Sequence, residues 1–343
     1  MERFISVDAG KFATKSVEYD LTNNKIIKSS FRTKLCDGDM RDDALESGTI
    51  LVNLNGKTYK IGNGARGNGA ELTTTKMADI HKICMLSAIA QFASSDEIDT
   101  INCAIGLPAS EWANVSKRED YKAFMFSDEE VVIQIRTDNS MNITEKRFRF
   151  GKTFVFPESI GALYMNDSPS IDQNSYVGVI DLGNLNLNAT LWQGVELLVD
   201  DSITDELGGN ILTRGLAAEL SSQFSRVNEA MVTNILSQPS EYRFLSNNSE
   251  DIKNESAKVI KRYLLDHARA IKRDCDSKKW PLDYMTLICI GGTSVVLSEE
   301  LKEVFGDNIT ILENSYYCNA LGFLRIMCAK LPEIKRIIEF NEG

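Results

Sequence analysis

Hydrophobic and polar residues along the chain follow two periodicities, which predict a mixture of strands and helices. Apolar residues dominate 4–7 and recur over 14–19, so we expect two antiparallel strands joined by a turn that contains Gly10. Apolar residues at helical spacing predict a helix over 77–92 and a long helix over 255–275. This combination is typical of an α/β protein.

The remaining segments extend this pattern. Further strands are expected at 49–54, 57–62, 99–105, 131–135, 146–150, 153–156, 175–180, 187–192, 284–290 and 308–312. Further helices are expected at 119–126, 157–165, 210–220, 298–305 and 319–329, the second of them beginning with Pro157. Residues 235–253 are polar, and we expect a loop there.

One arrangement occurs twice, once in each half of the chain. ISVDAGKFATKS begins at Ile5, and VGVIDLGNLNLNATL begins at Val177. Each is an apolar strand that ends in an aspartate, and each continues through x-Gly into a second strand. The two aspartates, Asp8 and Asp181, lie about half a chain length apart.

The length of the chain agrees with such a duplication, because 343 residues commonly form two domains. We therefore expect duplicated α/β domains that flank a cleft. The first would cover residues 1–162 together with a C-terminal return over about 320–343, and the second would cover 163–319.

An aspartate at the end of a buried strand needs a physical reason, because an unpaired buried carboxylate is costly. A magnesium ion supplies one, since Mg²⁺ keeps most of its waters and binds one or two carboxylates plus phosphate oxygens. The glycine permits a tight turn whose N–H groups face a phosphate, and Lys15 adds a positive charge. A plain hairpin turn explains one copy of the pattern, but its recurrence favours two loops that hold a polyphosphate and a metal.

Two pairs of glycines add to this prediction. Gly291 and Gly292 follow an apolar strand and precede Thr293, where they permit close approach to a flat base or sugar. Gly208 and Gly209 precede Asn210 at the start of a helix, which is a second turn suited to a nucleotide. Either pair alone is weak evidence.

Composition and charge exclude several classes of protein. The net charge is −11 and there is no dense basic run, so direct binding of nucleic acid is not expected. The seven cysteines form no C-x-x-C pair and the two histidines lie far apart, which argues against a zinc site or a Ser-His-Asp triad. Without a signal peptide or a membrane-length apolar run, we expect a cytoplasmic protein with no membrane partner.

Taken in order, the motifs resemble those of the actin and sugar-kinase superfamily. VDAGKFATKS resembles its first phosphate loop, PESIGALY its first connector and VIDLGNLNLNATL its second phosphate loop. CIGGTSVVL resembles the adenosine loop and YYCNALGFL the second connector. Within the superfamily, GLPASEW and PESIGA are most similar to the plasmid-segregating bacterial actins of the ParM type.

This resemblance implies a fold and a function. The fold would be a pair of ribonuclease-H-like, actin-like domains with a nucleotide cleft. The function would be a Mg²⁺-dependent ATPase, with GTP as an alternative substrate, that polymerises into filaments and moves plasmid copies apart. An adaptor of the ParR type would link the filament to DNA.

The resemblance also implies roles for particular residues. Glu158 would orient the attacking water, and Asp8 and Asp181 would hold magnesium, so Glu158 and Asp181 are the candidate catalytic residues. A helix cap at the first turn is the alternative interpretation of Glu158, and a solvated helix face is the alternative for Lys258. The implied nucleotide-binding residues are Asp8, Gly10, Lys11, Lys15, Gly183, Asn184, Gly208, Gly209, Asn210, Lys258, Gly291, Gly292 and Thr293.

The second phosphate loop departs from its family. It reads DLGNLNLN where ParM-type proteins often have DLGGTTLD, so Asn184 replaces a glycine and Asn188 replaces an aspartate. Asparagine adopts left-handed φ more readily than most residues, which would preserve the turn. Loss of the carboxylate at 188 would alter metal handling or slow hydrolysis. A small-molecule kinase of the same fold and a non-polymerising nucleotide-binding scaffold therefore stay open as alternatives.

Overall fold

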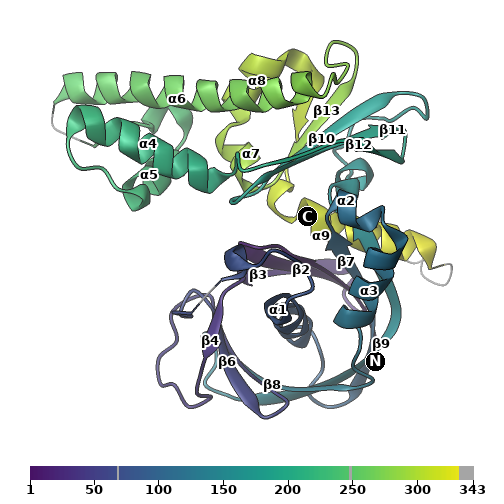
Figure 1. The fold of residues 1–343 in the computed structure, drawn as a ribbon. Coiled ribbons are helices and arrows are strands. Elements are labelled where there is room, and N and C mark those ends of the chain that lie inside the picture. Colours follow the sequence, from purple (N-terminus) through teal and green to yellow (C-terminus); the bar gives the residue numbers. More distant parts are fainter. Residues whose placement is uncertain (68, 247–248, 332–343) are drawn as a thin grey trace. The chain divides into compact units, whose positions relative to one another are not determined.

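A computed structural model describes residues 1–67, 69–246 and 249–331 of the chain (Figure 1). By its internal contacts the chain divides into two compact units, Met1–Met165 with Tyr317–Gly343, and Asn166–Tyr316. Each unit has a hydrophobic core of its own. Within the described residues, no helix has both the length and the apolar character needed to cross a membrane. Residues 332–343 of the expected C-terminal return lie outside the described part of the chain.

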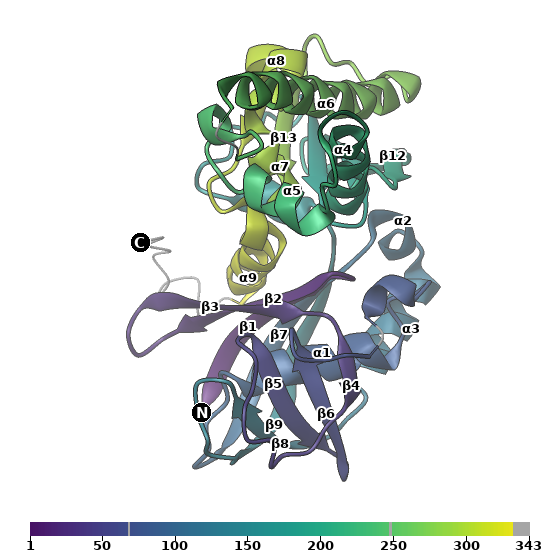
Figure 2. The same ribbon diagram turned by 90° about the vertical axis from the view of Figure 1, so that its left-hand side faces the viewer.

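The first unit contains a mixed nine-stranded sheet, counted over its described residues, in the order β3-β2-β1-β7-β9-β8-β5-β6-β4. Figures 1 and 2 show the sheet curling around helix α1, whose residues from Ile83 to Ala90 are all buried and, except for Ser87, apolar. The strands are β1 (Glu2–Ala9), β2 (Ala13–Asp20), β3 (Lys25–Arg32), β4 (Leu35–Asp37), β5 (Thr49–Leu54), β6 (Lys57–Gly62), β7 (Ile98–Leu107), β8 (Val131–Thr137) and β9 (Thr144–Pro157).

The helices of the first unit include one that returns from the end of the chain. This helix, α9, packs against β1, β2 and β7 and against the short 3-10 helix η2. The α-helices are α1 (Asp79–Ala90), α2 (Ala109–Trp112), α3 (Val115–Met125) and α9 (Cys318–Lys330), and the 3-10 helices are η1 (Ala70–Leu72) and η2 (Ile160–Tyr164); a further one, η5 (Ser315–Tyr317), precedes α9.

The second unit contains a five-stranded sheet, again over described residues, in the order β12-β11-β10-β13-β14. Its long helix α6 turns one stripe inward, with Val259, Ile260, Leu264 and Ile271 buried against the sheet and its neighbours. The elements are β10 (Tyr176–Leu182), β11 (Leu187–Gln193), β12 (Glu196–Asp205), β13 (Thr286–Ile290), β14 (Ile309–Ile311), α4 (Gly209–Phe224), α5 (Glu229–Leu236), α6 (Glu250–Ser277), α7 (Gly292–Val296), α8 (Ser298–Phe305), η3 (Ser240–Tyr242) and η4 (Gly306–Asn308).

Five strands of the first sheet have the same arrangement as the five strands of the second. The order β3-β2-β1-β7-β9 in the first matches β12-β11-β10-β13-β14 in the second. In both, the first three strands are antiparallel and the last three are parallel. The register also matches, because Asp8 lies opposite Lys15 and Asp181 lies opposite Asn188. The repeat in the sequence is therefore a repeat in the fold.

Two expectations about local structure are wrong. The strands expected at 146–150 and 153–156 are one strand, β9, which pairs with β7 along its length. No α-helix begins at Pro157, because β9 continues to that residue opposite Leu107. Only a 3-10 helix follows, since Ser159 has a φ of 76° and so interrupts a helical path.

Several elements are absent from the sequence-based prediction, among them β12 and α5. β12 was not expected because its sequence, ELLVDDSITD, carries acidic residues in place of a clean alternation. α5 was not expected because it is short and lies in a polar region, although Asn228 caps it by accepting a hydrogen bond from the Met231 N–H. The expected loop at 235–253 contains η3 and the start of α6.

The contact between η2 and α9 depends on two glycines. A Cβ atom on Gly322 would lie 2.1 Å from the Cα of Gly161, and a Cβ on Gly161 would lie 2.8 Å from the carbonyl oxygen of Cys318. Both distances are far below van der Waals contact, and the neighbours are backbone atoms that cannot turn aside. The two segments therefore cross at a distance that only glycine permits.

We expect Gly322→Ala to destabilise the protein by about 1–3 kcal/mol, because the added methyl group overpacks this crossing. Thermal unfolding followed by circular dichroism measures the change. Gly292→Ala is the control, since a Cβ there would lie at an ordinary 3.5 Å from Tyr316 Cδ2. Equal melting temperatures for the two variants would contradict the argument.

Candidate functional site

In the first unit, the candidate site begins at the hairpin of β1 and β2. Asp8 is the penultimate residue of β1 and its side chain is buried, with a residue exposure of 4%. Lys15 on β2 lies opposite, and its Nζ is 3.2 Å from Asp8 Oδ2. Gly10 and Lys11 occupy the turn between the strands, where a Cβ on Gly10 would lie 2.7 Å from the carbonyl oxygen of Ala13.

The charge state of Asp8 follows from competing effects. Burial raises the pKa of its carboxyl group, but the charges of Lys15 and Lys76 and hydrogen bonds from Lys15 and Asn319 outweigh burial. The net effect holds the pKa of Asp8 below its ordinary value. The strand therefore ends in an ionised carboxylate, which is the oxygen ligand that Mg²⁺ prefers.

A second ion pair lies in the same unit. Glu158, directly after β9, is 8% exposed, and Lys76 is 5% exposed. Lys76 Nζ is 2.9 Å from Glu158 Oε1, and it also donates a hydrogen bond of 2.7 Å to the carbonyl oxygen of Ala9. The alternative interpretation of Glu158 as a helix cap is wrong, because η2 has no side-chain cap and Glu158 pairs with Lys76.

Asn319, at the start of α9, joins the two connector segments to the first loop. Its Oδ1 accepts a hydrogen bond of 3.0 Å from the backbone N–H of Ser159, next to Glu158. Its side chain also hydrogen-bonds to Asp8. Asn319 is 7% exposed, so these bonds are largely shielded from water. One buried amide thus holds both the Asp8 carboxylate and the backbone beside Glu158.

In the second unit, the loop after β10 is tied to two helix starts. The carbonyl oxygen of Gly183 accepts hydrogen bonds from the Gly209 N–H at 3.1 Å and from Thr293 Oγ1 at 2.9 Å. The carbonyl oxygen of Asn184 accepts one from the Asn210 N–H at 2.7 Å. The Gly183 N–H closes the turn on the carbonyl oxygen of Asn186. Asn184 does not adopt positive φ, so the turn forms without the left-handed conformation that the sequence suggested.

The glycine pairs have a packing role in this loop. A Cβ on Gly208 would lie 2.4 Å from the backbone carbon of Leu185, and a Cβ on Gly209 would lie 2.6 Å from Thr293 Oγ1. Gly291 has a φ of 91°, and a Cβ there would lie 2.7 Å from Asp181 Oδ1. These glycines therefore bring the α4 and α7 starts close to Asp181 and the loop that follows it.

Asn188 occupies the position opposite Asp181. Its Oδ1 accepts hydrogen bonds from Asn186 Nδ2 and Thr204 Oγ1, each at 3.2 Å. The corresponding position in the first unit holds Lys15, which pairs with Asp8. The second carboxylate therefore has no cation at the equivalent strand position, and the two halves of the repeat differ in charge.

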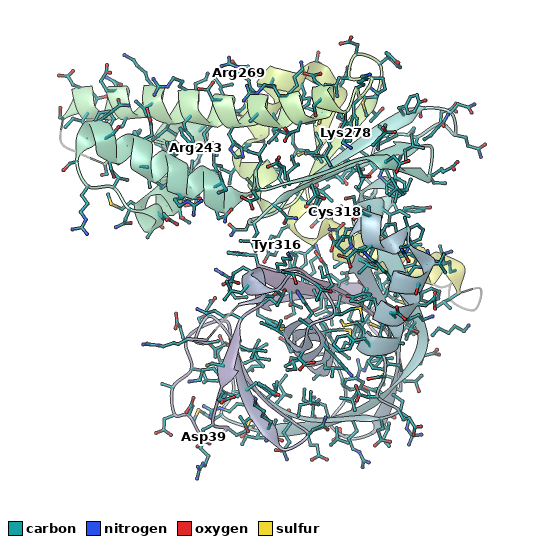
Figure 3. The ribbon with its side chains drawn as sticks, viewed as in Figure 1. Asp39, Arg243, Arg269, Lys278, Tyr316 and Cys318 are labelled. Atoms are coloured by element: carbon teal, nitrogen blue, oxygen red, sulfur yellow. The ribbon has the colours of Figure 1, made fainter. Side chains whose placement is uncertain are left out.

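Lys258 stands apart from these residues. It lies on α6, where its Nζ pairs with Glu255 at 3.1 Å, and its side chain is 73% exposed. The same helix carries other exposed ion pairs, including that of Arg269 with Asp266 (Figure 3). These contacts agree with the alternative interpretation of a solvated helix face.

The structure brings most of the predicted residues into two groups, one in each unit. The first group is Asp8, Gly10, Lys11, Lys15 and Glu158. The second group is Asp181, Gly183, Asn184, Gly208, Gly209, Asn210, Gly291, Gly292 and Thr293. Sequence reasoning missed Lys76 and Asn319. Asn319 lies within the YYCNALGFL motif, whereas Lys76 lies in TTTKM, a polar stretch without a motif.

Other metal or thiol chemistry finds no support. Among the described residues there is no cluster of three or more histidine, cysteine or acidic side chains that could hold a metal ion. The seven cysteines are free, and all but the half-buried Cys36 are buried. Burial raises the pKa of Cys84 to about 12, which keeps that thiol protonated.

His81 in α1 gives the first unit a pH dependence. Burial, and then the charge of Lys76, lowers the pKa of His81 from 6.5 to about 3. Between these values the unfolded chain binds a proton that the folded chain excludes, so stability is present above pH 6.5 and is lost as the pH falls. From pH 7 to pH 5 we expect His81 to account for a loss of about 2 kcal/mol in the free energy of unfolding.

Urea unfolding at both pH values measures this loss, and His81→Gln should reduce it by about that amount. His267 is also buried and has a lowered pKa, so a part of the pH dependence should persist in the variant. An identical loss in the variant and the wild type would contradict the assignment to His81.

Comparisons with known proteins agree with this architecture. Residues 6–161 match the family model described as actin-like proteins, N-terminal domain. The solved structure of an Alp12 filament is 23% identical, with 96% of this chain and 99% of that chain covered at a TM-score of 0.71. An archaeal actin homologue is 15% identical, with 95% of this chain and 99% of that chain covered at a TM-score of 0.75. A 15-stranded ParM filament from Clostridium botulinum is 18% identical, with 95% of this chain and 99% of that chain covered at a TM-score of 0.68. No curated protein sequence matches the chain.

The chain therefore has the actin-like fold, as the order of its motifs predicted. Residues 6–161 match the model of the actin-like proteins, and the described part of the chain is similar in fold to the ParM and Alp12 structures. The resemblance inferred from the motifs is confirmed at the level of the fold.

Proposed function

We propose that this protein binds a magnesium nucleotide and assembles into filaments, with hydrolysis of the nucleotide driving filament turnover. ATP is the expected nucleotide and GTP the alternative. The observation that carries the proposal is the strand-end aspartate that recurs at the same register position in both units, Asp8 and Asp181. The archaeal actin homologue has also been solved in complex with ADP, which supports nucleotide binding in this fold.

The residues present suit a magnesium ion with several bound waters. Asp8 is buried, and its lowered pKa favours the ionised form that a cation requires. Asp8 in the first unit and Asp181 in the second are each proposed as ligands of the ion, which when bound would neutralise charge on the phosphates. Lys15 would place a second positive charge near the phosphates, and Glu158 would orient the attacking water and accept its proton.

Self-association is the second part of the proposal. Alp12 and ParM chains with this fold are described as filaments, which supports a homopolymer as the assembled form. We further propose that the filament segregates plasmid DNA through an adaptor of the ParR type. A net charge of −11 favours such an indirect link, because an acidic surface repels DNA phosphates.

One observation favours a different function. The uncharged Asn188 opposite Asp181 leaves this half of the repeat without the second carboxylate common in ParM-type loops. A protein that binds nucleotide but hydrolyses it very slowly would act as a scaffold rather than as a dynamic filament. The rate of phosphate release distinguishes the two.

Sedimentation after addition of Mg²⁺ and ATP or GTP tests the proposal. The protein should appear in the pellet only with nucleotide, and mass spectrometry of the supernatant should find no phosphorylated small molecule beyond the nucleotides. Nucleotide binding without a pellet would support the scaffold. A phosphorylated metabolite formed from a cell extract would support a kinase.

A further inference from the structure

Lys76 is the most deeply buried lysine that pairs with the candidate site, and no role follows for it from the sequence motifs. It lies between η1 and α1, in a segment without regular structure. Its residue exposure is 5%. A lysine side chain is almost never buried to this extent unless its ammonium group is paired.

The ammonium group joins two segments that lie far apart in the sequence. Its Nζ donates to the carbonyl oxygen of Ala9, the last residue of β1, at 2.7 Å. It also pairs with Glu158 Oε1, just after β9, at 2.9 Å. One side chain therefore fixes Glu158 relative to the end of the strand that carries Asp8.

Lys76 keeps its charge in this contact. Burial opposes the charge on Lys76, but the neighbouring carboxylates of Glu158 and Asp8 outweigh burial and hold its pKa above the ordinary value. Together with Lys15 and Asp8, the site contains two ion pairs, Lys15 with Asp8 and Lys76 with Glu158. Removing one member would leave its partner as a buried charge without compensation.

Stability alone does not explain such a pair. A buried ion pair is often no more stabilising than apolar residues of similar volume, because both ions lose their hydration. Groups with strongly shifted pKa values, as Lys76 has, cluster at functional sites. This pair includes Glu158, the candidate catalytic residue, which also favours a functional role for Lys76.

We propose that Lys76 is a positioning residue for hydrolysis: it holds Glu158 by Oε1 and so presents the second oxygen, Oε2, to the attacking water. This inference rests on the proposed function, in which Glu158 orients that water. Lys76 keeps the carboxylate in one orientation, and the proton of the water passes to Glu158 and not to Lys76.

The competing interpretation is a purely structural tether of the 73–78 segment. The two differ in three measurable ways. A positioning residue lowers kcat while KM for the nucleotide changes little, and its loss has no further effect once Glu158 is replaced. Its effect is also partly reversed by arginine, which keeps the charge and the hydrogen-bond donors.

The test compares steady-state nucleotide hydrolysis by the wild type, Lys76→Met, Lys76→Arg, Glu158→Gln and the double variant Lys76→Met/Glu158→Gln. Lys82→Met is the matched control, because Lys82 on α1 pairs with Asp128 at 2.7 Å and has no contact with the site residues. Circular dichroism and thermal unfolding establish that each variant is folded. The double variant removes both charges and so leaves no unpaired buried ion. If Lys76→Met alone fails to fold, the double variant can still be compared with Glu158→Gln.

We expect Lys76→Met to lower kcat by about 10- to 100-fold, as is typical for the partners that orient catalytic groups, with KM within about threefold. Lys76→Arg should recover part of this loss, Lys82→Met should be unaffected, and the double variant should equal Glu158→Gln. Two results with an active wild type would overturn this inference and leave the proposed function standing. One is an unchanged kcat in Lys76→Met, and the other is a double variant slowed by the product of the two single effects. A wild type without hydrolysis would overturn the proposed ATPase function and this inference with it.

Discussion

Glu158→Gln is expected to slow phosphate release by about 100- to 10,000-fold, because it removes the base that accepts the proton of the attacking water. Glutamine keeps the shape of the side chain and an oxygen that faces Lys76, so the local packing should persist. Nucleotide affinity should change by less than about threefold, since Glu158 is proposed to act on the water rather than on the phosphates. Filaments of the variant should consequently outlive those of the wild type.

The rate of phosphate release under single-turnover conditions measures this effect directly. Glu130→Gln is a suitable control, because Glu130 pairs with Arg147 and Arg149 on the strand surface of the same unit. Wild-type release by Glu158→Gln would remove Glu158 from the mechanism. The loss of nucleotide affinity with an unchanged rate would instead make it a binding residue.

Asp181→Ala is expected to weaken magnesium-dependent nucleotide binding by about 30-fold or more, corresponding to a loss of roughly 2–5 kcal/mol when one partner of a charged contact is removed. The effect should be large because Asn188, opposite Asp181, is uncharged and offers no substitute ligand of equal strength. Isothermal titration with ATP in the presence of Mg²⁺ measures the affinity.

Two comparisons make this result specific. Asp200→Ala, an exposed position on β12 of the same unit, should bind like the wild type. Repeating the titrations with EDTA should abolish most of the difference between Asp181→Ala and the wild type. Wild-type affinity of Asp181→Ala in the presence of Mg²⁺ would contradict a metal-binding role for this residue.

The features that sequence reasoning predicted best are those that local patterns encode. Asp8 and Asp181 each lie one residue before the end of an apolar strand and two residues before a glycine, and this pattern depends only on neighbouring residues. The repeat of the pattern at half-chain spacing then predicted two similar α/β domains, and the structure adds that their sheets share a strand order. The strong helical periodicity of residues 255–275 likewise predicted most of α6.

The features that sequence reasoning missed depend on distant partners. Lys76 is part of the candidate site only because it contacts Ala9 and Glu158, and nothing in the sequence TTTKM indicates those contacts. β9 was divided in two on either side of Gly151, but pairing with β7 continues along both parts. Tertiary contacts therefore decided these cases against the local sequence.

The departure in the second phosphate loop was visible in the sequence, but its structural consequence was not. Asparagine at 184 was expected to use left-handed φ, whereas the loop is held by hydrogen bonds from the starts of α4 and α7. Those bonds come from residues downstream by tens of positions. A sequence pattern over a few residues carries no information about such partners.

The central claim is that nucleotide controls assembly, and one measurement tests it most directly. Light scattering and phosphate release are recorded together after Mg²⁺ and ATP are added to the purified protein, with GTP and a non-hydrolysable analogue in parallel. The account predicts scattering that rises only with nucleotide, decays as phosphate appears, and persists with the analogue. Scattering that is independent of nucleotide, or bound nucleotide without any rise over a wide range of protein concentrations, would contradict it.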